Sequence, residues 1–185
     1  DRDPRTRVIT TAYLTLASSN LIHQAKAGDD AADAKWFDVS KEVEYEDDFR
    51  RVSVLTLYNE ELKETLKYRI TDTAMGNWAK TTSEFIESES TNILAGDHIK
   101  IVNMAIEEVR HHAASTGILF NLLPAEFTLN ELQHTYEAVT GIKVDRSNFR
   151  RNAKKLVRAT GRTTMYWGKE TALYAANPLY VHLDF

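Results

Sequence analysis

The cations between positions 143 and 162 are the residues of this chain best suited to chemistry. The stretch holds eight basic residues and one acidic residue, so its formal charge is +7, whereas the whole chain carries −4. The remaining residues therefore sum to −11. A cationic surface on an otherwise acidic protein favours a sequence-independent attraction to phosphate groups. This stretch is the candidate binding surface.

The side-chain types indicate what each cation could contact. Arginine and asparagine make bidentate hydrogen bonds to guanine and adenine edges in the DNA major groove. The candidates for such contacts, with the serine among them, are Arg146, Ser147, Asn148, Arg150, Arg151 and Lys154. The candidates for backbone phosphate are Lys155, Arg158, Arg162 and Lys169. Two other interpretations stay open: a solvated helix face without a partner, and a surface for an acidic protein.

Two short helices joined by a tight turn are expected to position these side chains. Thr128 and Glu131 have the spacing of a capping box at the start of the first helix. Gly141 is typical of a left-handed cap at its end, and apolar residues recur between them at helical spacing. Asp145 is a natural N-cap for the second helix. The face that this helix should bury consists of Phe149, Ala153 and Leu156.

A β-hairpin is predicted directly after the second helix. Residues 163–178, TTMYWGKETALYAANP, contain two runs rich in Thr, Tyr and Trp around Gly168-Lys169. A hairpin that follows a helix–turn–helix is the wing of a winged helix, and Lys169 at its predicted tip could reach a backbone phosphate. The alternative is that the apolar residues of the hairpin only cover a small core.

Composition excludes several classes of protein. The chain has 185 residues, of which 43% are hydrophobic and 27% charged, as in ordinary globular proteins. No apolar run approaches the roughly 20 residues that span a bilayer, and the first residues lack a signal-peptide core. There is no cysteine, and the six histidines show no metal-ligand spacing. We expect a cytoplasmic protein without a membrane segment and without a cofactor in this chain.

The first part of the chain is predicted to contain strands and one helix. Residues 7–17 are rich in β-branched and aromatic side chains and are expected to form a strand. Residues 51–58 and 62–71 have the pattern of a hairpin, with alternating apolar and polar positions in the second arm. Apolar residues at helical spacing predict a helix over 97–112.

An α+β fold with two domains follows from this order of elements. A boundary near positions 115–117 would separate a strand-rich domain, residues 1–116, from a helical domain with a hairpin, residues 117–185. The second domain is the predicted winged helix.

Three segments of the first domain resemble the latter part of a Nudix domain. They are DRDPRTRVITTAYLTL, GDDAADAKWF and LAGDHIKIVNMAIEEVR, in that order. Combined with LLPAEFTLNELQHTYEAVTGIKVDRSNFRR, they resemble the Nudix-related transcriptional regulators, the NrtR-like family. The resemblance covers most of the chain apart from roughly residues 42–91. It implies a partial Nudix-like sheet-and-helix domain followed by a winged helix.

The resemblance also implies a function and partners. Members of the family are dimeric repressors that bind double-stranded operator DNA and respond to ADP-ribose or a related nucleotide or sugar, in NAD or sugar metabolism. On this basis the first domain would be the sensor, and the residues placed to approach its ligand are Arg5, Arg7 and Asp30. A solvated acidic loop around Asp30 and structural roles for the arginines are the alternatives.

The Nudix box itself is missing from this sequence. Nudix hydrolases hold Mg²⁺ with clustered glutamates that end in Glu-Glu-x-Gly, because that ion prefers oxygen ligands. Here Glu60-Glu61 falls in a predicted turn and Glu107-Glu108 lies on a predicted helix. We expect an N-terminal segment to precede Asp1 in the natural protein. The second hypothesis is therefore that this chain is the C-terminal portion of a Nudix hydrolase, with Mg²⁺ bound by the longer parent.

Overall fold

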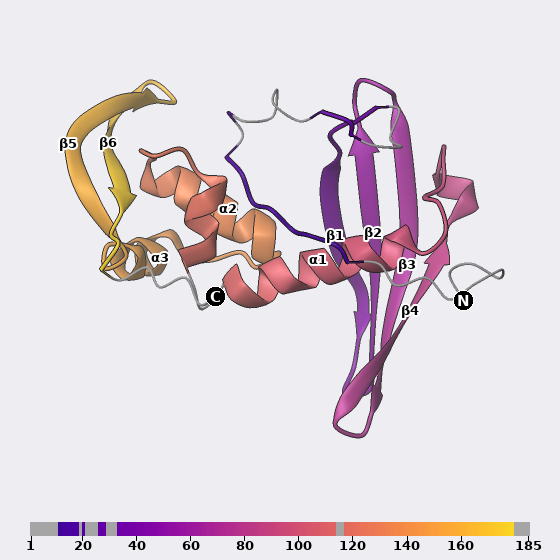
Figure 1. Ribbon diagram of the computed structural model, residues 1–185. Coiled ribbons are helices and arrows are strands. Elements are labelled where there is room, and N and C mark those ends of the chain that lie inside the picture. The colour runs from indigo at the N-terminus through magenta and orange to yellow at the C-terminus, as the bar shows by residue number, and fades with distance from the viewer. Residues whose placement is uncertain (1–10, 19, 21–25, 29–32, 114–116, 180–185) are drawn as a thin grey trace. The chain divides into compact units, whose positions relative to one another are not determined.

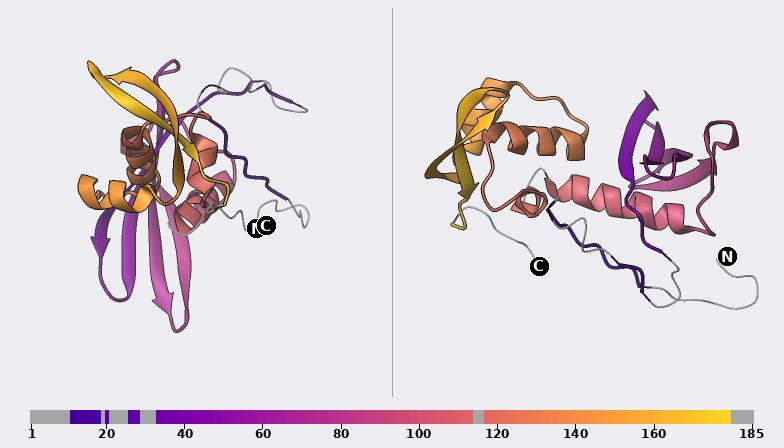
Figure 2. Two further views of the ribbon diagram at one scale, coloured as in Figure 1. Left: turned by 90° about the vertical axis from the view of Figure 1, so that its left-hand side faces the viewer. Right: turned by 90° about the horizontal axis from the view of Figure 1, so that it is seen from above.

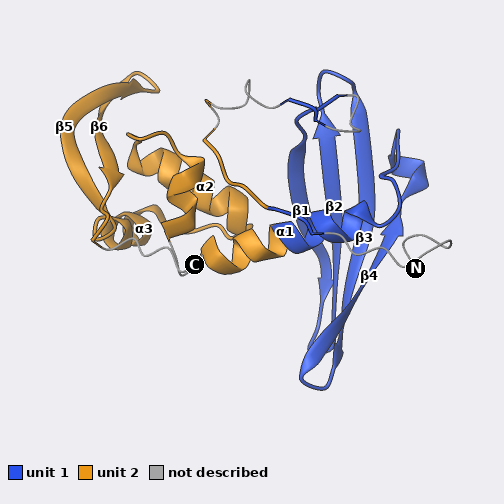
Figure 3. Cartoon of the chain, in the orientation of Figure 1, with its two compact units in different colours: residues 1–13, 25–105 blue, residues 14–24, 106–185 orange. Residues whose placement is uncertain are grey.

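Two compact units make up the chain (Figure 3). The computed structural model describes residues 11–18, 20, 26–28, 33–113 and 117–179. One unit comprises residues 1–13 and 25–105, and the other comprises residues 14–24 and 106–185. The division falls inside the helix α1 (His98–Ala113). The architecture is mixed α+β, as predicted.

A four-stranded antiparallel sheet forms the centre of the first unit (Figure 1). Its strands follow chain order, and they are β1 (Asp38–Glu46), β2 (Arg50–Asn59), β3 (Glu64–Met75) and β4 (Trp78–Phe85). A short 3-10 turn, η2 (Glu87–Glu89), follows β4. The hairpin expected from the alternating pattern is confirmed, since β2 pairs with β3 from Asn59↔Glu64 to Arg50↔Thr73.

One face of this sheet is buried. Every second residue of β3 from Leu66 to Ile70 is buried, opposite Leu57 and Leu55 of β2. The first turns of α1 cover this face, because Ile99 is buried and the side chain of Asn103 accepts a hydrogen bond from Lys41 of β1 at 2.8 Å. The period-two alternation therefore gave the correct inner face.

The strand predicted over residues 7–17 is wrong in its described part. Residues 11–17 form no strand and are mostly exposed, with Tyr13 extending into solvent. β-branched and aromatic content favours an extended chain, but a strand also needs a neighbour to satisfy its amides and carbonyls. The sheet of the described residues runs from β1 to β4 and includes no such pairing.

The second unit contains the predicted helix–turn–helix and hairpin. Its elements are η3 (Gly117–Leu122), α2 (Leu129–Thr140), α3 (Arg146–Ala153), β5 (Val157–Tyr166) and β6 (Lys169–Ala176). Both views in Figure 2 show β5 and β6 as a curved ribbon that extends beyond the helices of this unit. Phe127 pairs with Tyr174 of β6 as an isolated bridge, which adds a third extended segment. This is a winged helix.

A small core joins the helices to the hairpin. The buried residues that form it are Leu123, Phe127, Leu129, Leu132, Ala153 and Val157. Phe120, Phe149 and Tyr174 pack against this cluster. Each of the elements η3, α2, α3, β5 and β6 contributes to this cluster or lies beside it, so they share one hydrophobic core.

The second helix is shorter than expected. α3 ends at Ala153, Lys154 caps it, and Leu156 is exposed rather than buried. Val157 starts β5 and enters the core, and the carbonyl of Leu156 accepts from Asn177 N at 2.9 Å. From Val157 onward the chain pairs with β6 as a strand, where the helical spacing predicted another turn of helix. No helix of the described residues is long and apolar enough to cross a membrane.

Replacing Phe127 with alanine should destabilise the winged helix. Its side chain is only 2% exposed, and its backbone bonds to Tyr174 in both directions. The loss should be about 3–5 kcal/mol, as for other buried aromatics. Phe49→Ala is the matched control, because Phe49 is 72% exposed, and it should change stability by less than about 0.5 kcal/mol. Hydrogen exchange of the α2 amides measures both variants, and equal protection would contradict this account of the core.

Candidate nucleic-acid interface

The start and end of α2 are defined by its own sequence. Thr128 Oγ1 accepts from Glu131 N at 3.2 Å, and the Glu131 carboxylate accepts from Thr128 N at 2.6 Å. This reciprocal capping box is the one predicted. Gly141 closes the helix with a φ of 73°, a left-handed conformation in which any side chain would be strained.

One carboxylate holds the turn between the two helices. Glu137 of α2 accepts from Gln133 Nε2 at 3.0 Å, from Lys143 Nζ at 2.9 Å and from Val144 N at 3.2 Å. Its side chain is only 10% exposed. These donors, led by the Gln133 amide, lower the pKa of Glu137 from 4.5 to about 2. The turn that leads into α3 is therefore tied to the side of α2.

Asp145 then starts α3 as predicted. Its carboxylate accepts from Asn148 N at 2.8 Å. The eight residues of α3 carry three arginines, and their side chains point in two directions. Arg151 remains on the exposed side of the helix, where its Nη2 donates to Asn148 Oδ1 at 2.9 Å. Arg146 and Arg150 are directed toward α2.

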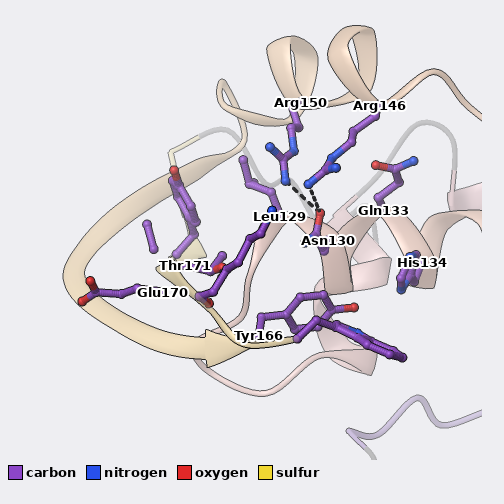
Figure 4. A pocket seen from close by; sticks show the side chains of 13 residues that line it. Leu129, Asn130, Gln133, His134, Arg146, Arg150, Tyr166, Glu170 and Thr171 are labelled. Carbon is purple, nitrogen blue, oxygen red and sulfur yellow. Dashed lines mark hydrogen bonds between the residues drawn. The ribbon is translucent and has the colours of Figure 1, made fainter.

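Two guanidinium groups converge on the side chain of Asn130 (Figure 4). Arg150 Nη2 lies 2.8 Å and Arg146 Nη2 lies 3.3 Å from Asn130 Oδ1. A single neutral oxygen thus holds two positive charges close together. Arg150 is half-buried, and its Nε is covered without an acceptor in the described part of the chain. A buried unpaired donor is costly, and an incoming anion could supply an acceptor near this pair.

These arginines line a hollow of about 710 Å³ between α2, α3 and the hairpin. The α2 side contributes Leu129, Asn130, Gln133 and His134, as Figure 4 shows. The hairpin side contributes Tyr166, Trp167, Lys169, Glu170, Thr171, Ala172 and Tyr174. With three cations and one carboxylate among its charged lining residues, the hollow is suited to a polyanion.

The predicted site residues do not all lie at this hollow. Arg146, Arg150 and Lys169 line it, whereas Asn148 and Arg151 occupy the exposed side of α3 with Ser147. Three predicted residues lie beyond the end of the helix instead: Lys154 and Lys155 in the following turn and Arg158 on β5. Arg162, also on β5, has its Nη2 2.6 Å from a Glu126 carboxylate oxygen, so its charge is already paired.

The hairpin was predicted, but its tip lies one residue earlier than expected. The strands end at Tyr166 and begin again at Lys169, so Trp167 and Gly168 form the turn. Lys169 is the first residue of β6 instead of the tip. Sequence analysis also missed three residues of α2 that line the hollow: Asn130, Gln133 and His134. Their one signal was their polar side chains at positions i, i+3 and i+4 of that helix.

The predicted ligand residues of the first domain, Arg5, Arg7 and Asp30, lie outside the described residues. Among the described residues, no group of three or more His, Asp or Glu side chains could hold a metal ion. This part of the chain therefore offers no fit for the Mg²⁺ that a Nudix hydrolase requires.

Part of the second unit is similar to a known family of domains. Residues 119–176 match the model of the NrtR DNA-binding winged helix domain. This segment is therefore similar to the DNA-binding domain of NrtR proteins. The match starts in η3 and ends at the last residue of β6. It therefore includes every residue that lines the hollow, among them the cations Arg146, Arg150 and Lys169.

Two solved structures of NrtR from Shewanella oneidensis are similar to this chain at 26% sequence identity. The one described as complexed with a 27mer DNA aligns over 55% of this chain and 49% of that chain, with a TM-score of 0.42. The other aligns over 53% and 46%, with a TM-score of 0.41. The match spans about half the length of these NrtR chains. No match was found among curated proteins.

The three hydrogen bonds accepted by the Glu137 carboxylate, here called the Glu137 clamp, predict a specific dependence of stability on pH. Because its pKa is about 2 in the folded chain and near 4.5 when unfolded, its stabilisation is complete above about pH 4.5. The stabilisation is lost as the pH falls from there toward 2. Glu137→Gln should lower the melting temperature at pH 7 and should reduce the further drop between pH 5 and pH 3. Glu108→Gln, at an exposed carboxylate of α1, is the control. Identical pH profiles for Glu137→Gln and the wild type would contradict the clamp.

Proposed function

We propose that this chain is a DNA-binding transcriptional regulator whose winged helix docks on double-stranded operator DNA through α3 and the β5–β6 hairpin. One observation carries the proposal. In a segment similar to the NrtR DNA-binding domain, two arginines of α3 are held side by side at a cationic hollow that the hairpin completes.

This arrangement favours DNA over a solvated helix face. Side chains that serve only solubility extend into water, whereas Arg150 is half-buried and shares its acceptor with Arg146. Holding two like charges together is unfavourable unless an anion joins them. A phosphodiester backbone supplies that anion. The formal charge of +7 over residues 143–162 would also attract it at long range. An acidic protein partner is the alternative that a DNA-binding assay must exclude.

The two sides of α3 suggest two kinds of contact. Asn148 and Arg151 are exposed, and their hydrogen bond to each other places an amide and a guanidinium side by side. These are the side chains that recognise adenine and guanine edges. Arg146, Arg150 and Lys169 face the hollow and would contact phosphate. We therefore assign base reading to the first pair and orientation on the duplex to the second group.

Effector control is a further part of the proposal. We propose that the first unit senses ADP-ribose or a related nucleotide or sugar in NAD or sugar metabolism, and that the regulator acts as a homodimer. The supporting observation is a second hollow of about 360 Å³ between the sheet and α1, lined in part by Thr81, Ser83, Lys100 and Asn103. Lysine, amide and hydroxyl groups are suitable donors for a phosphate or sugar. An effector that binds two states unequally would shift DNA affinity.

Hydrolysis of a nucleoside diphosphate derivative stays the second hypothesis, and it concerns a longer parent protein. It requires carboxylates that hold Mg²⁺, which the described residues do not provide. Magnesium-dependent release of AMP from ADP-ribose by the natural full-length protein would support it. Sedimentation of the same protein tests the homodimer.

Removing two cations of α3 should weaken DNA binding. A duplex enriched from a randomised library by the wild-type chain serves as the probe. Arg150→Ala combined with Arg151→Ala should lower affinity by tenfold or more and reduce the slope of log K against log salt, by roughly 0.9 for each phosphate that the variant no longer neutralises. A gel shift over a salt series measures both quantities.

The control for this pair carries the same change of charge on the first unit. Arg50→Ala combined with Lys80→Ala removes two exposed cations from the sheet and should leave affinity and slope nearly unchanged. If both double variants bind alike, α3 is not the DNA surface. If the wild type selects no duplex at all, the proposed function itself fails.

Asn130 gives an independent prediction about the arginine pair. Asn130→Asp would place a carboxylate against Arg146 and Arg150 and neutralise part of their positive charge. Aspartate is also favourable in the first turn of a helix, so α2 should still form. Folding stability should be kept or raised, while DNA affinity should fall by about tenfold, as when a hydrogen bond to a charged group is removed. Asn92→Asp, at an exposed position of the first unit, is the control. Unchanged affinity in Asn130→Asp would exclude contact between this pair and DNA.

A further inference from the structure

The tip of the β5–β6 hairpin carries an exposed tryptophan in an unfavourable backbone conformation. Trp167 is 89% exposed, with a φ of 49°, and Gly168 follows with a φ of 75°. Positive φ at both central residues is the pattern of a type I′ turn, which strongly prefers Asn-Gly or Gly-Gly. A tryptophan at the first position is strained by its Cβ and leaves a large apolar surface in water. Asparagine or glycine at this position would suit the turn better.

The surroundings of Trp167 indicate what it faces. Its indole lies edge-on to the ring of Tyr166, with centroids 6.5 Å apart. Both rings line the same hollow as Arg146 and Arg150, and Lys169 follows the turn on β6. A partner that occupies this hollow would therefore meet guanidinium groups on one side and an aromatic tip on the other. Phosphate and nucleobase together satisfy both sides.

We propose that Trp167 is a wedge that enters the minor groove of bound duplex DNA and stacks against a base step, bending the duplex. The proposal rests on the proposed DNA binding by α3. Apolar side chains inserted between base steps partly unstack them and kink the duplex, which then contacts more of the protein. Lys169 beside the tip would neutralise a phosphate at the groove edge. The ring thus gives the hairpin a role beyond a charge contact.

The open shape of the site favours duplex DNA over a free nucleotide. The hollow lies along three elements, and the tryptophan stands at its rim with most of its surface in solvent. A pocket for a small nucleotide would instead bury most of its ligand. A groove requires only a protruding tip beside a cationic surface, which is what α3 and the hairpin provide.

A substitution that preserves the turn tests the wedge. Trp167→Asn removes the ring and installs the residue that the turn prefers, so the hairpin should fold at least as well as in the wild type. On the selected duplex, a circular-permutation gel shift should show a bend of roughly 20° or more for the wild type and a smaller bend for Trp167→Asn. Affinity should fall about fivefold or more, the effect of removing one base stack. Trp78→Asn is the matched control, since Trp78 is also an exposed tryptophan beside a hairpin turn, and it should keep the wild-type bend and affinity.

Fluorescence distinguishes the sources of a nucleobase. In a chain whose Trp36 and Trp78 are replaced by phenylalanine, Trp167 is the remaining tryptophan. The selected duplex should quench its emission in a saturable manner, and ADP at the same phosphate concentration should not. Equal bends for the wild type and Trp167→Asn would overturn the wedge. Saturable quenching of the Trp167 emission by ADP in the absence of DNA would also overturn it. DNA binding by α3 would still stand if the wild type and Trp167→Asn bound the duplex without a difference in bend.

Discussion

The position of α3 depends on one partly buried interaction, the set of hydrogen bonds around the Glu137 carboxylate. Five residues separate α2 from α3, and a connection of this length could hold the second helix at many angles. Glu137 binds Lys143 and Val144 from the side of α2, so the connection runs back along that helix before Asp145 starts α3. Arg146 and Arg150 then lie opposite Asn130. An acidic residue outside the binding surface thus determines where its cations are.

A second constraint fixes the other wall of the hollow. Phe127 exchanges backbone hydrogen bonds with Tyr174 at 2.9 and 2.8 Å, and its ring is buried in the core shared by α2 and α3. The hairpin is therefore attached near its base to Phe127, two residues before the first residue of α2. Beyond Thr163 it has only its own pairing, from Thr163↔Ala172 to Tyr166↔Lys169, and its side chains are largely exposed there. The base of the hairpin serves stability, whereas the tip is free to serve recognition.

Local signals were predictable from the sequence, and contacts between elements were not. The Thr128–Glu131 box, the Gly141 cap and the Asp145 cap depend on residues within a few positions of one another, and all three are confirmed. The end of α3 was misplaced because Leu156 continues the helical spacing, while pairing across the hairpin decides the conformation of Val157. The polar spacing of Asn130, Gln133 and His134 did not single out Asn130, since its contacts with Arg146 and Arg150 form only when α3 packs on α2. The tip of the hairpin was placed one residue too late because tight turns prefer Asn-Gly or Gly-Gly, and this preference does not point to Trp167-Gly168 as the turn.

The arginine pair shows why stability and binding must conflict at this site. A carboxylate at position 130 would stabilise both guanidinium groups, yet it would also satisfy the charge that an incoming phosphate must neutralise. The neutral oxygen of Asn130 orients the two side chains and leaves their charge uncompensated. The same reasoning applies to Glu137, whose ion pair with Lys143 uses a cation on the turn and leaves those of α3 available. Glu137 and Asp145 therefore hold the turn and the start of α3 in place without pairing with the arginines that line the hollow. That separation allows a chain with a net charge of −4 to present a cationic surface to a polyanion.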